Sequence, residues 1–170
     1  MTLPLKPKRG GFLRPFGCGE FIRDFLLGIG PFGSLKVDPK EGAPQALIGR
    51  EYKLAVMRET ALDRATRIEE KASRKENRKI DPDIIENLAN EIFESLPYKT
   101  IACRLHSFRV YFCDLKKLGW VEPTGQEEPS DFQEHFPAGP PRKYFRLTAK
   151  GRQALDSAWK NPHKALYPKK

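Results

Sequence analysis

From Arg50 to Asp81 the chain contains neither glycine nor proline. Because these two residues are the strongest helix breakers, so long a run without them predicts one long helix, which we place at 46–79. Apolar residues recur in it every seven positions, namely Leu47, Leu54, Ala61 and Ile68. Charged Glu51 and Arg58 occupy the positions where the second apolar residue of each heptad should fall. A dimerisation helix and a helix packed across its own domain are therefore equally compatible with the sequence.

The end of this long helix is strongly basic, with Lys71, Arg74, Lys75, Arg78 and Lys79. The whole chain of 170 residues carries a formal net charge of +9. A basic protein attracts polyanions, and nucleic acid is the commonest of these. The alternative is a solvated basic surface without a specific partner.

The segment 81–96 predicts a core helix. Asp81 is a favourable N-cap, Pro82 suits the first helical position, and Pro97 requires the helix to end before it. Apolar residues follow one face at helical spacing, namely Ile84, Ile85, Leu88, Ala89, Ile92, Phe93 and Leu96.

Two further helices are expected, a short one at 99–105 and one at 108–118 that Ser107 caps and Gly119 ends. In the second helix the inward face holds Phe108, Tyr111, Leu115 and Leu118. That spacing places Val110, Phe112 and Cys113 on the outer face.

The C-terminal part predicts a small β-hairpin followed by a helix. Strands are expected at 120–123 and 143–147, the second with Phe145 and Leu147 on one side, and a loop at 124–141. Thr148 caps a final helix whose apolar face is Leu155, Ala158 and Trp159 and which ends at Pro162. Residues 161–170 form a basic tail.

Residues 1–45 are rich in proline and glycine. One amphipathic patch stands out, comprising Phe21, Ile22, Phe25, Leu26 and Ile29. It is compatible with a docked helix or with a loosely ordered arm; we expect a partly ordered N-terminal arm.

Two stretches, 111–122 and 143–152, resemble the winged helix-turn-helix transcriptional regulators, the group that includes the PadR-like and MarR-like families. The first is similar to the recognition helix running into the first wing strand, and the second to the other wing strand and its threonine-capped helix. The resemblance implies a mainly α fold. It consists of a winged helix-turn-helix domain at 80–160 with a small β-wing, preceded by the long basic helix and the arm. It also implies sequence-specific binding of duplex DNA, with the recognition helix at about 107–118 in the major groove.

The residues expected to contact DNA are Lys99, Thr100, Arg104, Ser107, Arg109, Phe112, Lys116, Arg142 and Lys143. Arg109 is the expected base reader, whereas lysines more often bind phosphate, and Phe112 suits a thymine methyl group. The expected partners are double-stranded DNA and a second copy of the chain. No cofactor is expected.

Two features favour an alternative function. The apolar outer face formed by Val110, Phe112 and Cys113 suits a protein partner, so the domain could be a protein-interaction module. Acidic residues in the expected wing loop would be repelled by phosphates, namely Glu127, Glu128, Asp131 and Glu134. We expect that loop to fold back onto the domain.

No motif indicates an enzyme. Cys103, His106 and Cys113 form the one metal-like cluster, but structural zinc needs four ligands and no second pair of ligands exists, so no metal is expected. Three widely spaced cysteines do not indicate a disulfide framework, and no apolar run is long enough to span a bilayer. The expected location is the cytoplasm.

Overall fold

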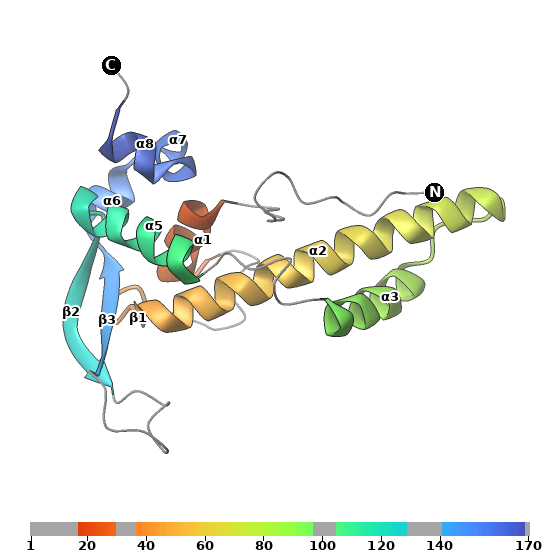
Figure 1. The fold of residues 1–170 in the computed structure, drawn as a ribbon, viewed down its shortest axis with the longest axis horizontal. Helices are drawn as coiled ribbons and strands as arrows, with labels where there is room; N and C mark the ends of the chain where they lie inside the picture. Colours follow the sequence, from red (N-terminus) through yellow and green to blue (C-terminus); the bar gives the residue numbers. More distant parts are fainter. Residues whose placement is uncertain (1–16, 30–36, 97–104, 129–140, 169–170) are drawn as a thin grey trace. The chain divides into compact units, whose positions relative to one another are not determined.

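The computed structural model describes residues 17–29, 37–96, 105–128 and 141–168. The fold is mainly helical with one small antiparallel sheet, as expected (Figure 1). The chain divides into two compact units. Of the described residues, 53–96 belong to a helical unit, and 17–52 with 105–168 belong to a sheet unit. This division differs from the expected boundaries after residues 45 and 79, since the helix near 81–96 and the two hairpin strands fall in different units.

The helical unit contains most of α2 (Gln45–Lys75) and all of α3 (Pro82–Ser95), which runs back beside α2 (Figure 1). The long helix is confirmed close to its expected bounds. Its seven-residue apolar repeat is not uniformly buried, because Ala61 is 1% exposed whereas Ile68 is 47% exposed. The seven-residue repeat therefore does not form one continuous buried stripe along α2.

Glu69 closes the turn between α2 and α3. Its buried carboxylate accepts hydrogen bonds from Arg78 Nη2 at 2.6 Å and Nη1 at 3.0 Å, and from the Asp81 backbone N–H at 2.9 Å. These bonds hold the pKa of Glu69 below its ordinary value, the Arg78 side-chain bonds contributing most. Asn77, with a φ of 51°, adopts the left-handed backbone conformation within this turn.

The expected cap and end of α3 are confirmed. The Asp81 side chain accepts a hydrogen bond from the Asp83 N–H at 2.9 Å, Pro82 is the first helical residue, and the helix ends at Ser95. The prediction that this is a core helix is wrong, because none of its residues is buried. Its apolar face is therefore only partly covered.

The sheet unit begins with α1 (Cys18–Leu27), β1 (Ala43–Pro44) and the first turns of α2. It continues after residue 104 with α5 (Leu105–Leu118), β2 (Val121–Glu128) and β3 (Arg142–Leu147). The antiparallel sheet has the order β1-β3-β2, with Ala43 opposite Phe145 and Val121 opposite Leu147. Strand β2 is longer than expected, and Asp131 and Glu134 lie outside the described residues.

The amphipathic patch near the N-terminus forms α1, so of the two alternatives open for this patch the structure shows the docked helix. Phe21 and Ile22 are fully buried. The ring of Phe21 lies 5.2 Å from that of Tyr52, and Tyr52 lies 6.4 Å from Phe108. Helix α1 therefore contributes to the same aromatic core as α2 and α5, which is the apolar contact that an isolated amphipathic segment lacks.

The predicted end of α5 is confirmed, whereas its predicted N-cap is wrong. Gly119 has a φ of 73° directly after the last helical residue, as its expected role as a helix stop requires. Ser107 is not the N-cap, because the helix already includes Leu105 and His106.

The C-terminal segment is divided into α6 (Ala149–Gln153), α7 (Asp156–Lys160) and α8 (Pro162–Leu166) instead of forming one helix. Thr148 caps α6 as expected, accepting a hydrogen bond from the Gly151 N–H at 3.0 Å. Leu155 is 73% exposed, so its placement on an apolar face is wrong. Trp159 is fully buried, and its ring lies 4.7 Å from that of Trp120.

Candidate functional site

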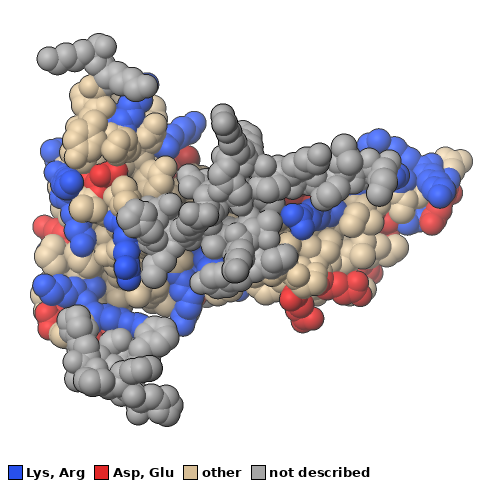
Figure 2. Space-filling model, in the orientation of Figure 1, with Lys and Arg blue, Asp and Glu red and all other residues tan. Residues whose placement is uncertain are grey.

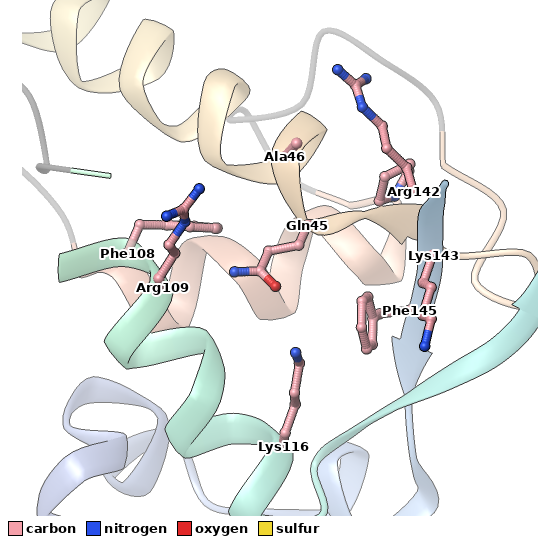
Figure 3. A pocket seen from close by; sticks show the side chains of 9 residues that line it. Gln45, Ala46, Phe108, Arg109, Lys116, Arg142, Lys143 and Phe145 are labelled. Atoms are coloured by element: carbon pink, nitrogen blue, oxygen red, sulfur yellow. The ribbon is translucent and has the colours of Figure 1, made fainter. Parts of the chain in front are cut away.

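A pocket of about 420 Å³ lies in the sheet unit, between α5, β3 and the start of α2 (Figure 3). We call it the basic groove. It is lined by Pro44, Gln45, Ala46, Phe108, Arg109, Lys116, Arg142, Lys143 and Phe145. Four of these nine residues are cations, and the aromatic rings of Phe108 and Phe145 are nearly buried beneath them.

Helix α5 contributes two of the cations. Arg109 and Lys116 are seven residues apart, a spacing that places them on one side of a helix about two turns from each other. The Lys116 ammonium lies 4.7 Å from the ring centre of Phe145 and 5.4 Å from that of Phe112. These cation–π contacts hold the ammonium at the groove, where Figure 3 shows it extending toward the space between α5 and β3.

Strand β3 contributes the other two cations. Alternation along the strand puts Leu147 and Phe145 in the core, 4% and 7% exposed, and places exposed Lys143 further along the same face. The strand face that buries Leu147 and Phe145 therefore ends with the positive charge of Lys143 at the groove. Arg142 precedes it at the beginning of β3.

Acidic residues of β2 face this end of β3, with Glu127 opposite Lys143 and Glu128 opposite Arg142. The carboxylate of Glu128 accepts a hydrogen bond from the Tyr144 hydroxyl at 2.7 Å, which raises the pKa of Tyr144. In the described part of the chain, Arg109, Lys116 and Lys143 form no ion pair with a carboxylate. Their charges are therefore available to an external anion.

The start of α2 adds a polar wall to the groove. Gln45 is the first residue of this long helix, and its side chain extends into the groove (Figure 3). The first backbone N–H groups of a helix have no intrahelical partner and favour anions. Four cations and a helix start converge on one pocket, an arrangement suited to binding an anionic group.

The structure brings four predicted site residues together: Arg109, Lys116, Arg142 and Lys143 all line the groove. Lys99, Thr100 and Arg104 lie outside the described residues, as does the side chain of Ser107.

The expected placement of Phe112 is wrong. It is fully buried, with its ring 6.0 Å from that of Phe108 and 5.1 Å from that of Phe145. The buried face of α5 follows Phe108, Phe112 and Leu115, which leaves Tyr111 partly exposed. Phe112 can therefore contact neither a thymine methyl group nor a protein partner.

The sequence analysis did not predict that Pro44, Gln45 and Ala46 line the groove. The nearest signal was Gly42, since a glycine just before a long helix can mark a tight approach to another strand. Gly42 has a φ of 72°, and a Cβ atom there would lie 1.8 Å from the Phe145 carbonyl oxygen.

Within the described residues there is no group of three or more His, Cys, Asp or Glu side chains that could hold a metal ion. Cys103 and the side chain of His106, two members of the metal-like cluster, lie outside those residues. Cys113 is an exposed free thiol on α5.

None of the described helices is both long and apolar enough to cross a bilayer. Comparisons with protein-family models, with curated proteins and with solved structures found no match. The function must therefore be inferred from the residues of this chain.

Proposed function

We propose that this chain is a cytoplasmic regulator that binds duplex DNA sequence-specifically, with the basic groove as its phosphate-contacting surface. The observation that carries the proposal is the convergence of Arg109, Lys116, Arg142 and Lys143 on one pocket. Arginine and lysine side chains make most phosphate contacts in protein–DNA complexes.

The sheet unit supports a winged-helix interpretation. The recognition helix is the expected one, but the two helices before it differ from those expected from the sequence. In this interpretation the three helices of the winged-helix core are α1, the first turns of α2, and α5, and the β2–β3 hairpin is the wing. Helix α5 is then the recognition helix, with exposed Arg109 near its beginning. Residues 53–103 then separate the second of these helices from the third in the sequence, and α3 belongs to that segment.

The charge of the C-terminal segment favours the same partner. Residues 141–168 contain one carboxylate side chain, that of Asp156, and seven basic ones: Arg142, Lys143, Arg146, Lys150, Arg152, Lys160 and Lys164. Arg142 and Lys143 are the two of these that line the groove, and neutralising phosphates with such side chains releases condensed counterions, which supplies much of the affinity of DNA-binding proteins. The other five, Lys160 and Lys164 among them, lie outside the groove and contribute only long-range attraction. The expected contribution from the end of the long helix is smaller, because Arg78 is already paired with Glu69 and Glu76.

The competing interpretation, a protein-docking surface on α5, loses its central residue because Phe112 is buried. Val110, 43% exposed, and Cys113 remain on the surface. Two separate side chains form a much smaller apolar surface than the expected trio.

The test is binding of the full chain to a random duplex by fluorescence anisotropy across a salt series. The groove variant Lys116→Gln/Lys143→Gln is compared with a charge-matched control, Lys160→Gln/Lys164→Gln, whose lysines are exposed on α7 and α8. We expect the groove variant to lower the slope of log K against log salt by about 1.8, at roughly 0.9 per phosphate contact. The control should change it much less.

Absence of binding at low salt would contradict the proposal. Equal changes of slope in the two variants would also contradict it, because the attraction would then come from total charge and not from the groove.

A further inference from the structure

All the charged side chains of helix α3 are acidic. It contains the carboxylates Asp83, Glu86, Glu91 and Glu94 and no lysine or arginine. All four side chains are exposed, and none forms an ion pair within the described ranges. Figure 2 shows this row of acidic side chains on the helical unit.

The α2 helix of the same unit carries exposed side chains of the opposite, positive charge. Its exposed cations are Arg58, Lys71, Arg74 and Lys75, and basic side chains gather at the far end of the helix (Figure 2). These four also form no ion pair with any described carboxylate. The turn itself is neutralised internally, because Arg78 pairs with Glu69 and Glu76. The acidic and basic surfaces of one hairpin therefore do not satisfy each other.

Apolar side chains remain exposed between these charges. Ile68 on α2 is 47% exposed, Ile80 in the turn 48%, and Ile84 on α3 37%. No residue of α3 is buried, although the helix is amphipathic. Exposed apolar side chains flanked by unpaired charges are typical of an interface whose partner is absent.

We propose that this hairpin is covered by the hairpin of a second copy of the chain, with α3 of each copy against the basic part of α2 of the other. A suitable partner must present a basic helical surface with apolar residues, and α2 presents one. In a twofold dimer the acidic-to-basic contact forms twice, because the same patch serves both subunits.

The lengths of the two surfaces agree. At about 1.5 Å per residue, the 14 residues of α3 extend roughly 21 Å, and the stretch of α2 from Arg58 to Lys75 roughly 26 Å. Each acidic helix can therefore lie along this stretch, with carboxylates of α3 against the basic group at the end of α2, Lys71, Arg74 and Lys75. The dimer does not depend on DNA binding, although it would supply two basic grooves per particle.

The test is sedimentation equilibrium of the full chain at low and high salt. We expect a mass of twice 19.5 kDa at low salt and a weaker dimer at high salt. Two charge reversals are made, Glu91→Lys/Glu94→Lys on α3 and Lys71→Glu/Lys75→Glu on α2. Each alone should weaken the dimer by about tenfold or more, because like charges then face each other.

The decisive measurement is the combination of the two reversals in one chain, which should restore most of the lost affinity. Reversing Lys160 and Lys164, outside the hairpin, should leave the dimer unchanged, and circular dichroism checks that every variant folds. A wild-type chain that is monomeric up to roughly 100 μM overturns the proposal. So does a combined variant weaker than either single reversal. A monomer that still binds DNA with the expected salt slope would leave the proposed function intact.

Discussion

Phe112 of α5 and Phe145 of β3 meet edge to face, with their ring centres 5.1 Å apart and their planes at 77°. Phe112 is fully buried and Phe145 is 7% exposed. The Lys116 ammonium lies over both rings. This contact therefore joins the helix and the strand that form the two sides of the basic groove.

Replacing Phe112 with alanine should lower the free energy of unfolding by about 3–5 kcal/mol, because a fully buried ring leaves a cavity in a packed core. Urea denaturation, followed by the fluorescence of buried Trp120 and Trp159, measures this loss. Val110→Ala is the control on the same helix, and its 43% exposure predicts a change within about 0.5 kcal/mol. A similar, small change in both variants would contradict the burial of Phe112.

The helix ends could be predicted because their signals are local. Asp81 with Pro82, Gly119 and Thr148 each act on backbone groups within a few residues, and the structure confirms all three. The buried side of α5 could not be predicted in the same way. Phe108 and Leu115 are compatible with either Tyr111 or Phe112 as the inward residue between them. The choice depends on Phe145, which comes from a distant strand.

Local sequence signals also could not predict which segments belong to which of the two units. Ala43 pairs with Phe145, and this pairing brings the start of α2 to the groove. No periodicity in the sequence indicates a contact between such distant positions. The cations of the groove were easier to predict, because charged residues on an outer helix face and at a strand end are visible in the sequence. Gln45, an uncharged residue at a helix start, gave no such signal.

Gly42→Ala should cost more stability than the left-handed backbone alone requires. A Cβ atom at position 42 would lie 1.8 Å from the Phe145 carbonyl oxygen, so β1 would have to move away from β3. Gly125→Ala is a matched control, since its φ of 89° is also positive but nothing lies within 4 Å of the added atom. The control should lose about 1–2 kcal/mol in urea denaturation and Gly42→Ala clearly more. Equal losses would contradict a close approach at Gly42.

The Glu69 carboxylate should make the stability of the hairpin dependent on pH. Its pKa in the folded chain lies below the ordinary value of 4.5, the bonds from Arg78 being the main cause. A lowered pKa means that the ionised form stabilises the fold above about pH 4.5, and that this contribution is lost as the pH falls through the folded pKa. Glu69→Gln should therefore melt below the wild type at pH 7, and the difference should shrink as the pH falls below 4.5.

Thermal melts followed by far-UV circular dichroism measure this difference. Glu70→Gln is the control, because the neighbouring carboxylate forms no ion pair in the described part of the chain. The Glu70→Gln variant should melt close to the wild type both at pH 7 and below pH 4.5. A gap between Glu69→Gln and the wild type that stays constant with pH would show that the Glu69 charge does not contribute.

Arg109→Ala separates reading of bases from binding of phosphate at the groove. If Arg109 reads a base, its loss should cost about 1–3 kcal/mol at a duplex selected from a random pool by the wild-type chain, and less on random duplex. Lys116→Gln should weaken binding to both duplexes alike, because a phosphate contact carries no sequence information. Anisotropy titrations with both duplexes at one salt concentration measure the two differences. An Arg109→Ala loss of equal size on selected and random DNA would assign Arg109 to the phosphates, and sequence reading would then have to come from other exposed residues of α5.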